Sequence, residues 1–410
     1  MRRLGAVLLL ASLAAAALSV PARAQESPFA LRRAQPGDGP AAGYLRLRDA
    51  EAAFRGGERW DEYTQYRAQA AAALGLHAEA LAWWDGRHSP VTAPAVVFGS
   101  PPRAADAAEW IAARADTARV VMVNEAHHDA ASRLLTLALL PRLYAEGYRY
   151  FAAEAFAADS VLAAQPPYPT PAMGTYLGEP VFGEIVREAL RLGYTLVPYE
   201  IEDGEEGGPD PQARRDSMQA VHLAERTVER DPAARVLVHA GFAHVYETAD
   251  EYWHPMAAFF RERTGIDPLT VDQIAMSEHS TRAYDSVDYR AAESSLRGVP
   301  AVLLPPSGEP LRLGNAAPVD VQVVRPRTVY RDGRPTWMAL GGSRVLETVP
   351  LPDACVRTIC VAEVRLPGEP GSTPLDRVVA EHVREAAVYV PAMGPFEVTV
   401  VDGRTGTLLP

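Results

Sequence analysis

The feature that most constrains this chain of 410 residues is an alternation of short β-branched runs with helical patterns between residues 104 and 306. Six runs have the composition of buried strands: 119–123, 149–153, 194–199, 234–239, 269–275 and 300–304. Helical patterns lie between most of them, at 130–146, 181–192, 211–230 and 255–264. Alternation of this kind is typical of parallel strands, since each crossover lays a helix over a face of the sheet. The sequence therefore predicts an α/β fold, a mainly parallel sheet with helices on both faces.

The regions on either side of this alternation have a different character, and a chain of this length exceeds one typical domain. Residues 25–95 form a Pro- and Gly-rich linker followed by a helical N-terminal segment, and residues 96–314 carry the α/β pattern. Residues 315–410 have strand composition with Asp-Gly and Pro-Gly turns, interrupted by one helical pattern at 376–386. We expect them to form a mostly-β C-terminal domain.

The first 24 residues have the parts of a secretory signal peptide. Arg2 and Arg3 precede an apolar run over 4–20, and Ala22-Arg23-Ala24 supplies the small-x-small cleavage site. No later segment approaches spanning length without charges. The sequence therefore predicts a periplasmic or secreted protein with no membrane anchor after cleavage of the signal.

Cysteine usage agrees with export. Cys355 and Cys360 are the two cysteines of the chain, five positions apart. In an oxidising compartment we expect a disulfide between them, with two buried free thiols as the alternative.

The charged residues exclude several classes of function. The chain has 40 basic and 52 acidic residues, and its formal net charge at pH 7 is −12. Nucleic acids and anionic lipids bind clustered positive charge, so neither is expected as a partner. Every basic residue is arginine, which excludes Schiff-base lysines and phosphate-loop lysines.

Histidines and glutamates follow several of the predicted strands. In an open parallel sheet, ligands bind beyond the carboxyl ends of the strands, where such residues meet at one edge. We therefore expect the polar residues that close four of the runs to converge. In chain order they are Glu125, His127, His128, Glu154, Glu200, His239 and His244.

Several of these residues also have a purely structural interpretation. His127 and His128 fit a helix cap or the surface, His239 fits a buried histidine in the strand core, and Glu200 opens an acidic loop. Arg215 begins a predicted helix, where a positive charge is unfavourable. That position indicates a carboxylate partner for Arg215, with an exposed arginine as the alternative.

The chemistry open to such a cluster is limited. Histidines with carboxylates can bind a divalent metal that acidifies its water, and the candidate ligands are His127, Glu154 and His244. Without a metal, a His–Glu pair can activate water while Arg215 or a second histidine steadies the oxyanion. The chain has no G-x-S-x-G elbow, no H-E-x-x-H and no phosphate loop. Hydrolysis by activated water is therefore the favoured hypothesis.

Three short segments between about 119 and 246 resemble the erythromycin-esterase/ChaN-like superfamily, to which TraB/TIKI-type proteins are related. VVMVNEAHHDAASRLLTLALLPRLYAEGYRYFAAEAF is similar to a first strand ending in Gly-Glu-x-(x)-His, an arginine on the next helix, and a glutamate after the second strand. RRDSMQAV resembles an Arg-Asp-x-x-Met-Ala helix, and RVLVHAGFAHV a strand ending in Gly and His. The three occur in the family's order.

The resemblance implies functional roles for specific residues. They are Glu125, His127 or His128, Arg133, Glu154, Arg215 and His244. The Glu-x-His spacing of the ChaN-like branch selects His127, whereas the Glu-x-x-His spacing of the esterases selects His128. Asn124 departs from the family's glycine, and the short stretch before Pro180 argues against macrolide specificity.

We expect His127 or His128 to act as base or metal ligand, supported by Glu125 and Glu154. His244 is the second acid/base group or metal ligand, and we expect the bond hydrolysed to be a small ester or a peptide bond. Arg215 completes the catalytic set as an anchor, while Arg133, Glu200 and His239 are expected to bind a small-molecule or peptide substrate.

Two alternatives stay open. The family also contains a haem-binding branch, so the same histidines could serve as axial ligands, with Tyr199 or Tyr246 nearby. The third hypothesis is an inactive scaffold that binds another protein through its helical or β region.

Overall fold

The protein is represented by a computed structural model that describes residues 26–162, 167–251, 253–314 and 318–410. The predicted signal peptide lies outside the described residues. No helix within the described ranges is long and apolar enough to cross a membrane.

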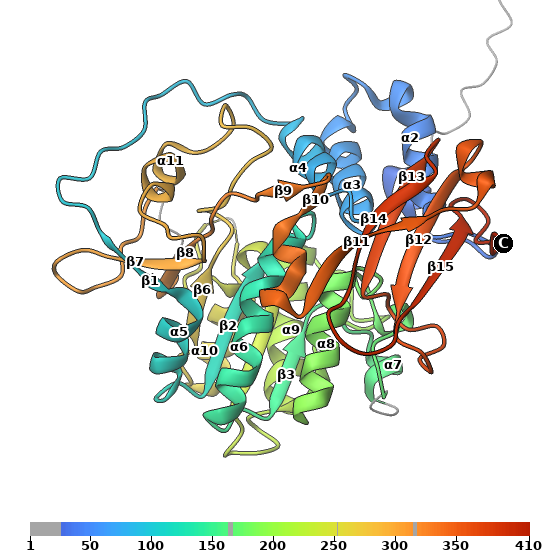
Figure 1. The fold of residues 1–410 in the computed structure, drawn as a ribbon. Coiled ribbons are helices and arrows are strands. Elements are labelled where there is room, and N and C mark those ends of the chain that lie inside the picture. Colours follow the sequence, from blue (N-terminus) through green and yellow to red (C-terminus); the bar gives the residue numbers. More distant parts are fainter. Residues whose placement is uncertain (1–25, 163–166, 252, 315–317) are drawn as a thin grey trace, which may run out of the picture.

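An eight-stranded sheet forms the centre of the α/β region (Figure 1). Its order is β1-β7-β8-β6-β2-β5-β3-β4. The strands from β8 to β4 in this order are parallel, whereas β7 pairs antiparallel with β8 and β1 antiparallel with β7. The strands are β1 (Arg103–Asp106), β2 (Val120–Glu125), β3 (Tyr150–Ala153), β4 (Thr195–Pro198), β5 (Val236–Gly241), β6 (Leu269–Asp272), β7 (Ala301–Leu304) and β8 (Val321–Val324).

Helices cover both faces of this sheet. Val121 and Val123 of β2 pack in one core with α5 (Ala107–Ala115), α6 (Arg133–Ala145) and α8 (Pro180–Leu192). Val120 and Met122 of the same strand pack in the opposite core with α9 (Pro211–Arg226) and α10 (Met256–Thr264). Successive side chains of a strand point to opposite faces, so a strand buried on both sides must be apolar throughout. The predicted fold class and all six predicted strands are confirmed, within a few residues of their expected ends.

The N-terminal helices and the C-terminal strands share a core, although they lie at opposite ends of the sequence. Figure 1 shows the blue helices beside the orange and red strands. Leu45 and Tyr63 of the helices pack with Val361 of β12. The helices are α1 (Pro28–Arg32), α2 (Ala42–Phe54), α3 (Trp60–Ala72) and α4 (His77–Asp85), and α7 (Ala158–Leu162) and α11 (Val287–Glu293) lie within the α/β region.

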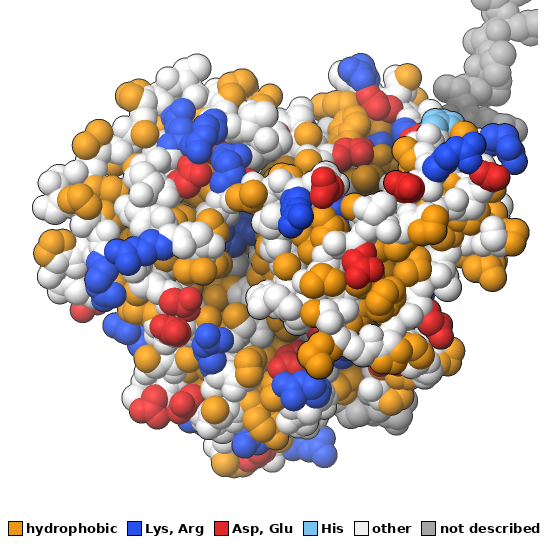
Figure 2. All heavy atoms as spheres, viewed as in Figure 1, with side chains coloured by type: hydrophobic (Ala, Val, Ile, Leu, Met, Phe, Trp, Pro, Cys, Tyr) orange, Lys and Arg blue, Asp and Glu red, His pale blue; other side chains and the backbone are white. Residues whose placement is uncertain are grey.

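The C-terminal region contains three small antiparallel sheets, with pairs β9–β10 and β11–β14 and the order β13-β12-β15. Its strands are β9 (Tyr330–Arg331), β10 (Arg334–Pro335), β11 (Arg344–Pro350), β12 (Ile359–Arg365), β13 (Asp376–Glu381), β14 (Glu385–Pro391) and β15 (Glu397–Asp402). On the face drawn in Figure 2, acidic and basic side chains are interspersed with apolar ones.

Two details differ from expectation. The helix predicted at 376–386 is wrong, because these residues form β13 and the start of β14. Val378 and Val379 pair with Ala362 and Val361 of β12, and this long-range pairing overrides the local helical pattern. In addition, β8 extends the large sheet beyond the boundary expected at residue 314, because it pairs with β6.

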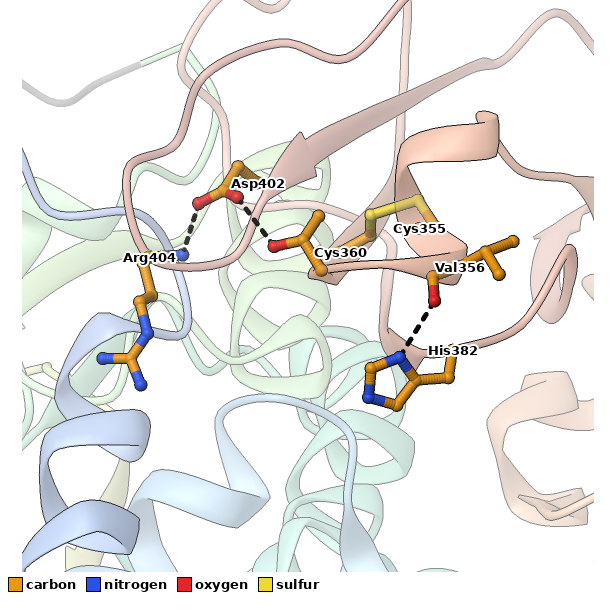
Figure 3. The surroundings of a disulfide bond; sticks show 7 residues. Cys355, Val356, Cys360, His382, Asp402 and Arg404 are labelled. Atoms are coloured by element: carbon orange, nitrogen blue, oxygen red, sulfur yellow. Dashed lines mark hydrogen bonds between the residues drawn. A yellow bond between two sulfur atoms is a disulfide. The ribbon is translucent and has the colours of Figure 1, made fainter.

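The expected disulfide is present. Cys355 and Cys360 are bonded, with their Cα atoms 5.4 Å apart, and both are buried (Figure 3). The bond joins a 3-10 turn (Asp353–Val356) to the start of β12. Nearby, Thr358 donates to Asp402 at 3.1 Å, which ties the same corner to β15.

The disulfide should stabilise the C-terminal region. Replacing both cysteines, Cys355→Ala with Cys360→Ala, is expected to lower the free energy of unfolding by about 2 kcal/mol, the loop-closure value for so short a loop. Urea denaturation measures this difference. Dithiothreitol should destabilise the parent protein and leave the double variant unchanged; equal effects of the reductant on both would contradict the prediction.

Candidate functional site

The candidate site lies at the carboxyl ends of β2, β5, β3 and β4, which are neighbours in the sheet. Glu125 is the last residue of β2 and is in register with Gly241, the last residue of β5. Glu154 follows β3 directly, and its backbone N–H donates to the carbonyl oxygen of His239 at 3.1 Å. The parallel register therefore brings three strand ends together.

The first histidine of the site is fixed by a buried carboxylate. Nδ1 of His127 lies 2.8 Å from Oε1 of Glu125. Burial raises the pKa of Glu125, but the neighbouring Arg133, His127 and His239 outweigh it and hold the pKa well below its ordinary value. Glu125 is therefore ionised, which favours the tautomer with the proton on Nδ1 and leaves Nε2 of His127 as the basic nitrogen.

Arg133 holds this carboxylate in place. Its Nε donates to Oε2 of Glu125 at 2.5 Å, and its Nη1 donates to Glu179 at 2.8 Å. Glu179 also accepts from the backbone N–H groups of Val181 and Phe182, as the N-cap of α8. A helix end thus fixes the second carboxylate of the network.

Two aromatic residues in strained backbone conformations clamp the His127 ring. Tyr176 stacks on it at a centroid distance of 4.4 Å, and Phe242 packs edge-on at 4.9 Å. Both have positive φ, 66° for Tyr176 and 44° for Phe242. Such conformations cost about 1–3 kcal/mol each and are concentrated at functional sites.

His127 and Glu154 both lie against Gly241. A Cβ atom on Gly241 would lie 2.5 Å from Cε1 and 2.7 Å from Nε2 of His127, and 2.8 Å from Oε2 of Glu154. The Gly241 backbone N–H also donates to Glu154. Close approach of the two side chains therefore requires glycine here, although the backbone conformation does not.

The second histidine has its own carboxylate. Nδ1 of His244 lies 2.6 Å from Oδ1 of Asp216, which is fully buried and also accepts from Trp253 Nε1 and the Met256 N–H. Nε2 of His244 lies 3.1 Å from Nη1 of Arg215 and 3.9 Å from Glu154. Asp216 therefore orients His244 so that its Nε2 faces Glu154.

The charges around His244 favour its protonation. Burial lowers its pKa, but Glu154 and Asp216 outweigh burial and raise it above the ordinary value. While neutral, Nε2 accepts a hydrogen bond from Arg215; on protonation it becomes a donor. His244 can thus give and take a proton beside Glu154.

Arg215 has two carboxylate partners. Its Nη2 donates to Oε1 of Glu154 at 2.5 Å, and its Nε donates to Oε1 of Glu200 at 3.0 Å. Burial raises the pKa of Glu154, but His244, Arg215 and His127 outweigh it and lower this pKa to about 2. Glu154 is therefore an ionised centre that connects the two histidines.

A cleft of about 1040 Å³ opens onto this centre. Its wall includes Glu154, Tyr176, Glu200, Arg215 and Arg32. His127 and His244 lie directly behind this wall, with side chains 12% and 9% exposed. The cleft is large enough for a small-molecule ligand.

The other histidine of the pair is turned away from the centre. His128 is buried, and its ring stacks on Trp84 at 3.8 Å and 10°. Burial lowers its pKa to about 3, so it is neutral. Of the two histidines left open by the sequence, His127 is the one that contacts Glu125, and it lies against Gly241 as Glu154 does.

Arg133 and His239 were expected to bind substrate, but both are buried behind Glu125, with 1% and 2% exposure. Nδ1 of His239 is hydrogen-bonded to the Thr136 hydroxyl at 2.9 Å, and its Nε2 lies 3.2 Å from Oε2 of Glu125. Neither side chain reaches the cleft, so the expectation that they bind substrate is corrected. Both side chains instead position Glu125. Glu200, by contrast, lines the cleft.

Sequence reasoning missed three members of the site. Asp216 directly follows Arg215 in the RRDSMQAV segment, and Glu179 precedes Pro180 at a predicted helix start, so both had a local signal. Tyr176 had none, since only the folded loop places it on His127.

Within the described ranges, no group of three or more His, Cys, Asp or Glu side chains is arranged to hold a metal ion. The carboxylates of Glu125, Glu154 and Glu200 are instead paired with arginines. Tyr199, expected near a bound haem, is fully buried, and its hydroxyl donates to the carbonyl oxygen of His239 at 3.0 Å.

Gly241→Ala tests the close approach of the His127 and Glu154 side chains to the backbone at residue 241. The added methyl should force both side chains to move, at a cost of about 1–3 kcal/mol in the free energy of unfolding. Gly99→Ala is the matched control, because a Cβ there meets nothing within 4 Å. Equal stability of the two variants in urea denaturation would contradict this geometry.

The pH dependence of stability tests the charge of Glu154. Because its pKa is lower in the folded chain than in the unfolded one, its ionisation stabilises the fold above about pH 4.3, and this contribution declines as pH falls towards 2. The stability lost in Glu154→Gln should therefore be largest near neutral pH and smaller at pH 3. Urea denaturation at both pH values measures it, with Glu347→Gln on an exposed part of β11 as control. A loss that does not change with pH would contradict the assignment.

Comparison with known proteins does not assign the chain to a family. No family model matches it, and no curated protein sequence matches it. A solved structure titled as the type III effector HopBA1 aligns with 58% of this chain and 99% of its own, with 10% identity and a TM-score of 0.33. Another, titled "Bacterial protein toxins", aligns with 60% of this chain and 46% of its own, with 12% identity and a TM-score of 0.30. Neither likeness is close enough to carry an argument about function.

Proposed function

We propose that this protein is an exported hydrolase in which His127 activates water against a small ester or peptide bond. One observation carries the proposal. Two histidines, His127 and His244, are each fixed through Nδ1 by a buried carboxylate. His127 and the ionised Glu154 both lie against Gly241, and Nε2 of His244 is 3.9 Å from Glu154. Histidines oriented in this way are suited to general acid–base catalysis.

In the first step, Nε2 of His127 removes a proton from water as the water oxygen attacks the carbonyl carbon. Ionised Glu125 stabilises the imidazolium that forms. The negative charge that develops on the carbonyl oxygen is balanced by Arg215 and protonated His244. Their placement beside Glu154 gives the oxyanion a defined position at the inner end of the cleft.

In the second step, the bond to the leaving group breaks and Nε2 of His244 supplies the proton that the leaving group needs. His127 then releases its proton to solvent, and His244 takes one up. The raised pKa of His244 supports this role, because the ring is protonated over a wider pH range than a free histidine. Glu154 stays ionised throughout and keeps the Arg215 and His244 side chains in position.

The proposal of export is supported by the N-terminal sequence pattern and by the disulfide between Cys355 and Cys360. Disulfides persist in oxidising compartments such as the periplasm or the extracellular medium. A substrate outside the cytoplasm is therefore proposed as well. The haem-binding and scaffold hypotheses have no comparable observation in their favour.

The direct test compares hydrolysis by His127→Gln and His128→Gln on a panel of small esters and short peptides. Loss of the base should lower kcat by about 10²–10⁴-fold in His127→Gln. His128→Gln should keep kcat within a few-fold, because His128 faces Trp84. Thermal denaturation of both variants controls for folding.

Three results would overturn this proposal. The first is equal activity of His127→Gln and the parent protein. The second is that neither protein hydrolyses any substrate of the panel. The third is loss of activity in EDTA with recovery on addition of Zn²⁺, which would transfer His127, Glu154 and His244 to the metal-dependent alternative.

A further inference from the structure

Arg32 and Arg33 both line the cleft without a carboxylate partner among the described residues, and Arg32 is the half-buried one of the two, whereas Arg33 is exposed. Nη1 of Arg32 donates to the side-chain oxygen of Gln69 at 2.6 Å, and no carboxylate of the described residues lies within ion-pair distance. Arg215, the third arginine of the lining, by contrast pairs with two carboxylates. Arg32 is half-buried and lines the cleft, so it is a partly desolvated cation without a counter-charge.

Aromatic rings hold this guanidinium in place. Its Cζ lies 5.7 Å from the centre of the Tyr66 ring and 5.6 Å from that of Tyr176. Cation–π contacts of this kind attract the guanidinium without using its N–H groups. Among the described residues, Nε and Nη2 of Arg32 have no hydrogen-bond acceptor, so these donors are available to a ligand.

Tyr176 connects Arg32 to the proposed base. The same ring that contacts Arg32 stacks on His127 at 4.4 Å. One tyrosine therefore separates an unneutralised cation in the cleft from the imidazole that would activate water. An anionic group of a substrate that pairs with Arg32 would therefore lie near the bond to be broken.

We propose that Arg32 is a specificity-determining residue that binds a carboxylate of the substrate. This inference rests on the proposed hydrolase function and names its substrate class. A carboxylate matches the planar, forked donors of a guanidinium. The acidic residues Asp159, Glu202 and Asp203 in the same cleft disfavour a dianion such as a phosphate monoester, so a single negative charge fits the site best.

Arg32 also has a structural role to exclude, since its ring contacts help to attach α1 to the loop that carries Tyr176. A purely structural role would make the loss of Arg32 affect neutral and anionic substrates alike. A carboxylate-binding role would make the loss selective. The test therefore needs a pair of substrates that differ in charge and little else.

The paired substrates are 4-acetoxybenzoate and its neutral counterpart 4-acetoxybenzamide. Arg32→Gln should lower kcat/KM for the benzoate by at least about tenfold, as expected for a lost hydrogen bond to a charged group, and leave the benzamide within about twofold. Arg191→Gln removes one exposed, remote arginine of α8 and should change neither substrate. A similar loss on both substrates in Arg32→Gln, or no loss on either, would overturn the inference.

A binding measurement separates this inference from the hydrolase proposal. Calorimetry with the products, 4-hydroxybenzoate and 4-hydroxybenzamide, needs no turnover. The parent protein should bind the benzoate at least tenfold more tightly than Arg32→Gln does, and the two proteins should bind the benzamide equally. Benzoate binding that depends on Arg32, without ester hydrolysis, would support carboxylate binding by Arg32 and contradict the hydrolase proposal. Ester hydrolysis without an Arg32-dependent preference for benzoate would support the hydrolase proposal and contradict carboxylate binding by Arg32.

Discussion

The proposed site depends on one buried guanidinium between two carboxylates. Arg133 lies between Glu125 and Glu179, and none of the three side chains is more than 2% exposed. Removing one member of such a network leaves a buried charge without a partner, which costs about 3–5 kcal/mol. Because Arg133 keeps Glu125 ionised, the carboxylate can hold Nδ1 of His127 and leave Nε2 basic. The chemistry proposed for His127 thus depends on Arg133 and Glu125, which are buried behind the residues that line the cleft.

The two ends of the chain contribute to the same site. The N-terminal helices and the strand β12 share a core, and this core carries α1 to the cleft, where Arg32 meets Tyr176. The loop bearing Tyr176 also joins the C-terminal region, because Thr373 donates to the carbonyl oxygen of Leu177 at 2.6 Å. The cleft is therefore walled by the sheet edge on one side and by a terminal segment on the other.

The sequence predicted the parts of the fold and site that follow from local pattern. Alternating runs predicted the sheet, and the rule that parallel strands end at one edge brought Glu125, Glu154 and His244 together. Long-range contacts supplied the rest. Residues 376–386, which form β13 and the start of β14, were mistaken for a helix because their strand form depends on pairing with β12 and β11. The contact between Tyr176 and Arg32 depends on a loop and the N-terminal helix α1, which come together only in the folded chain.

The most direct test of the central claim is the kcat for ester hydrolysis in His127→Gln, His244→Gln and the double variant, measured together. If both histidines act in one reaction around Glu154, the double variant should lose no more than the worse single variant, because groups that act as a unit are strongly non-additive. Losses that multiply in the double variant, or a full rate in either single variant, would contradict a shared site.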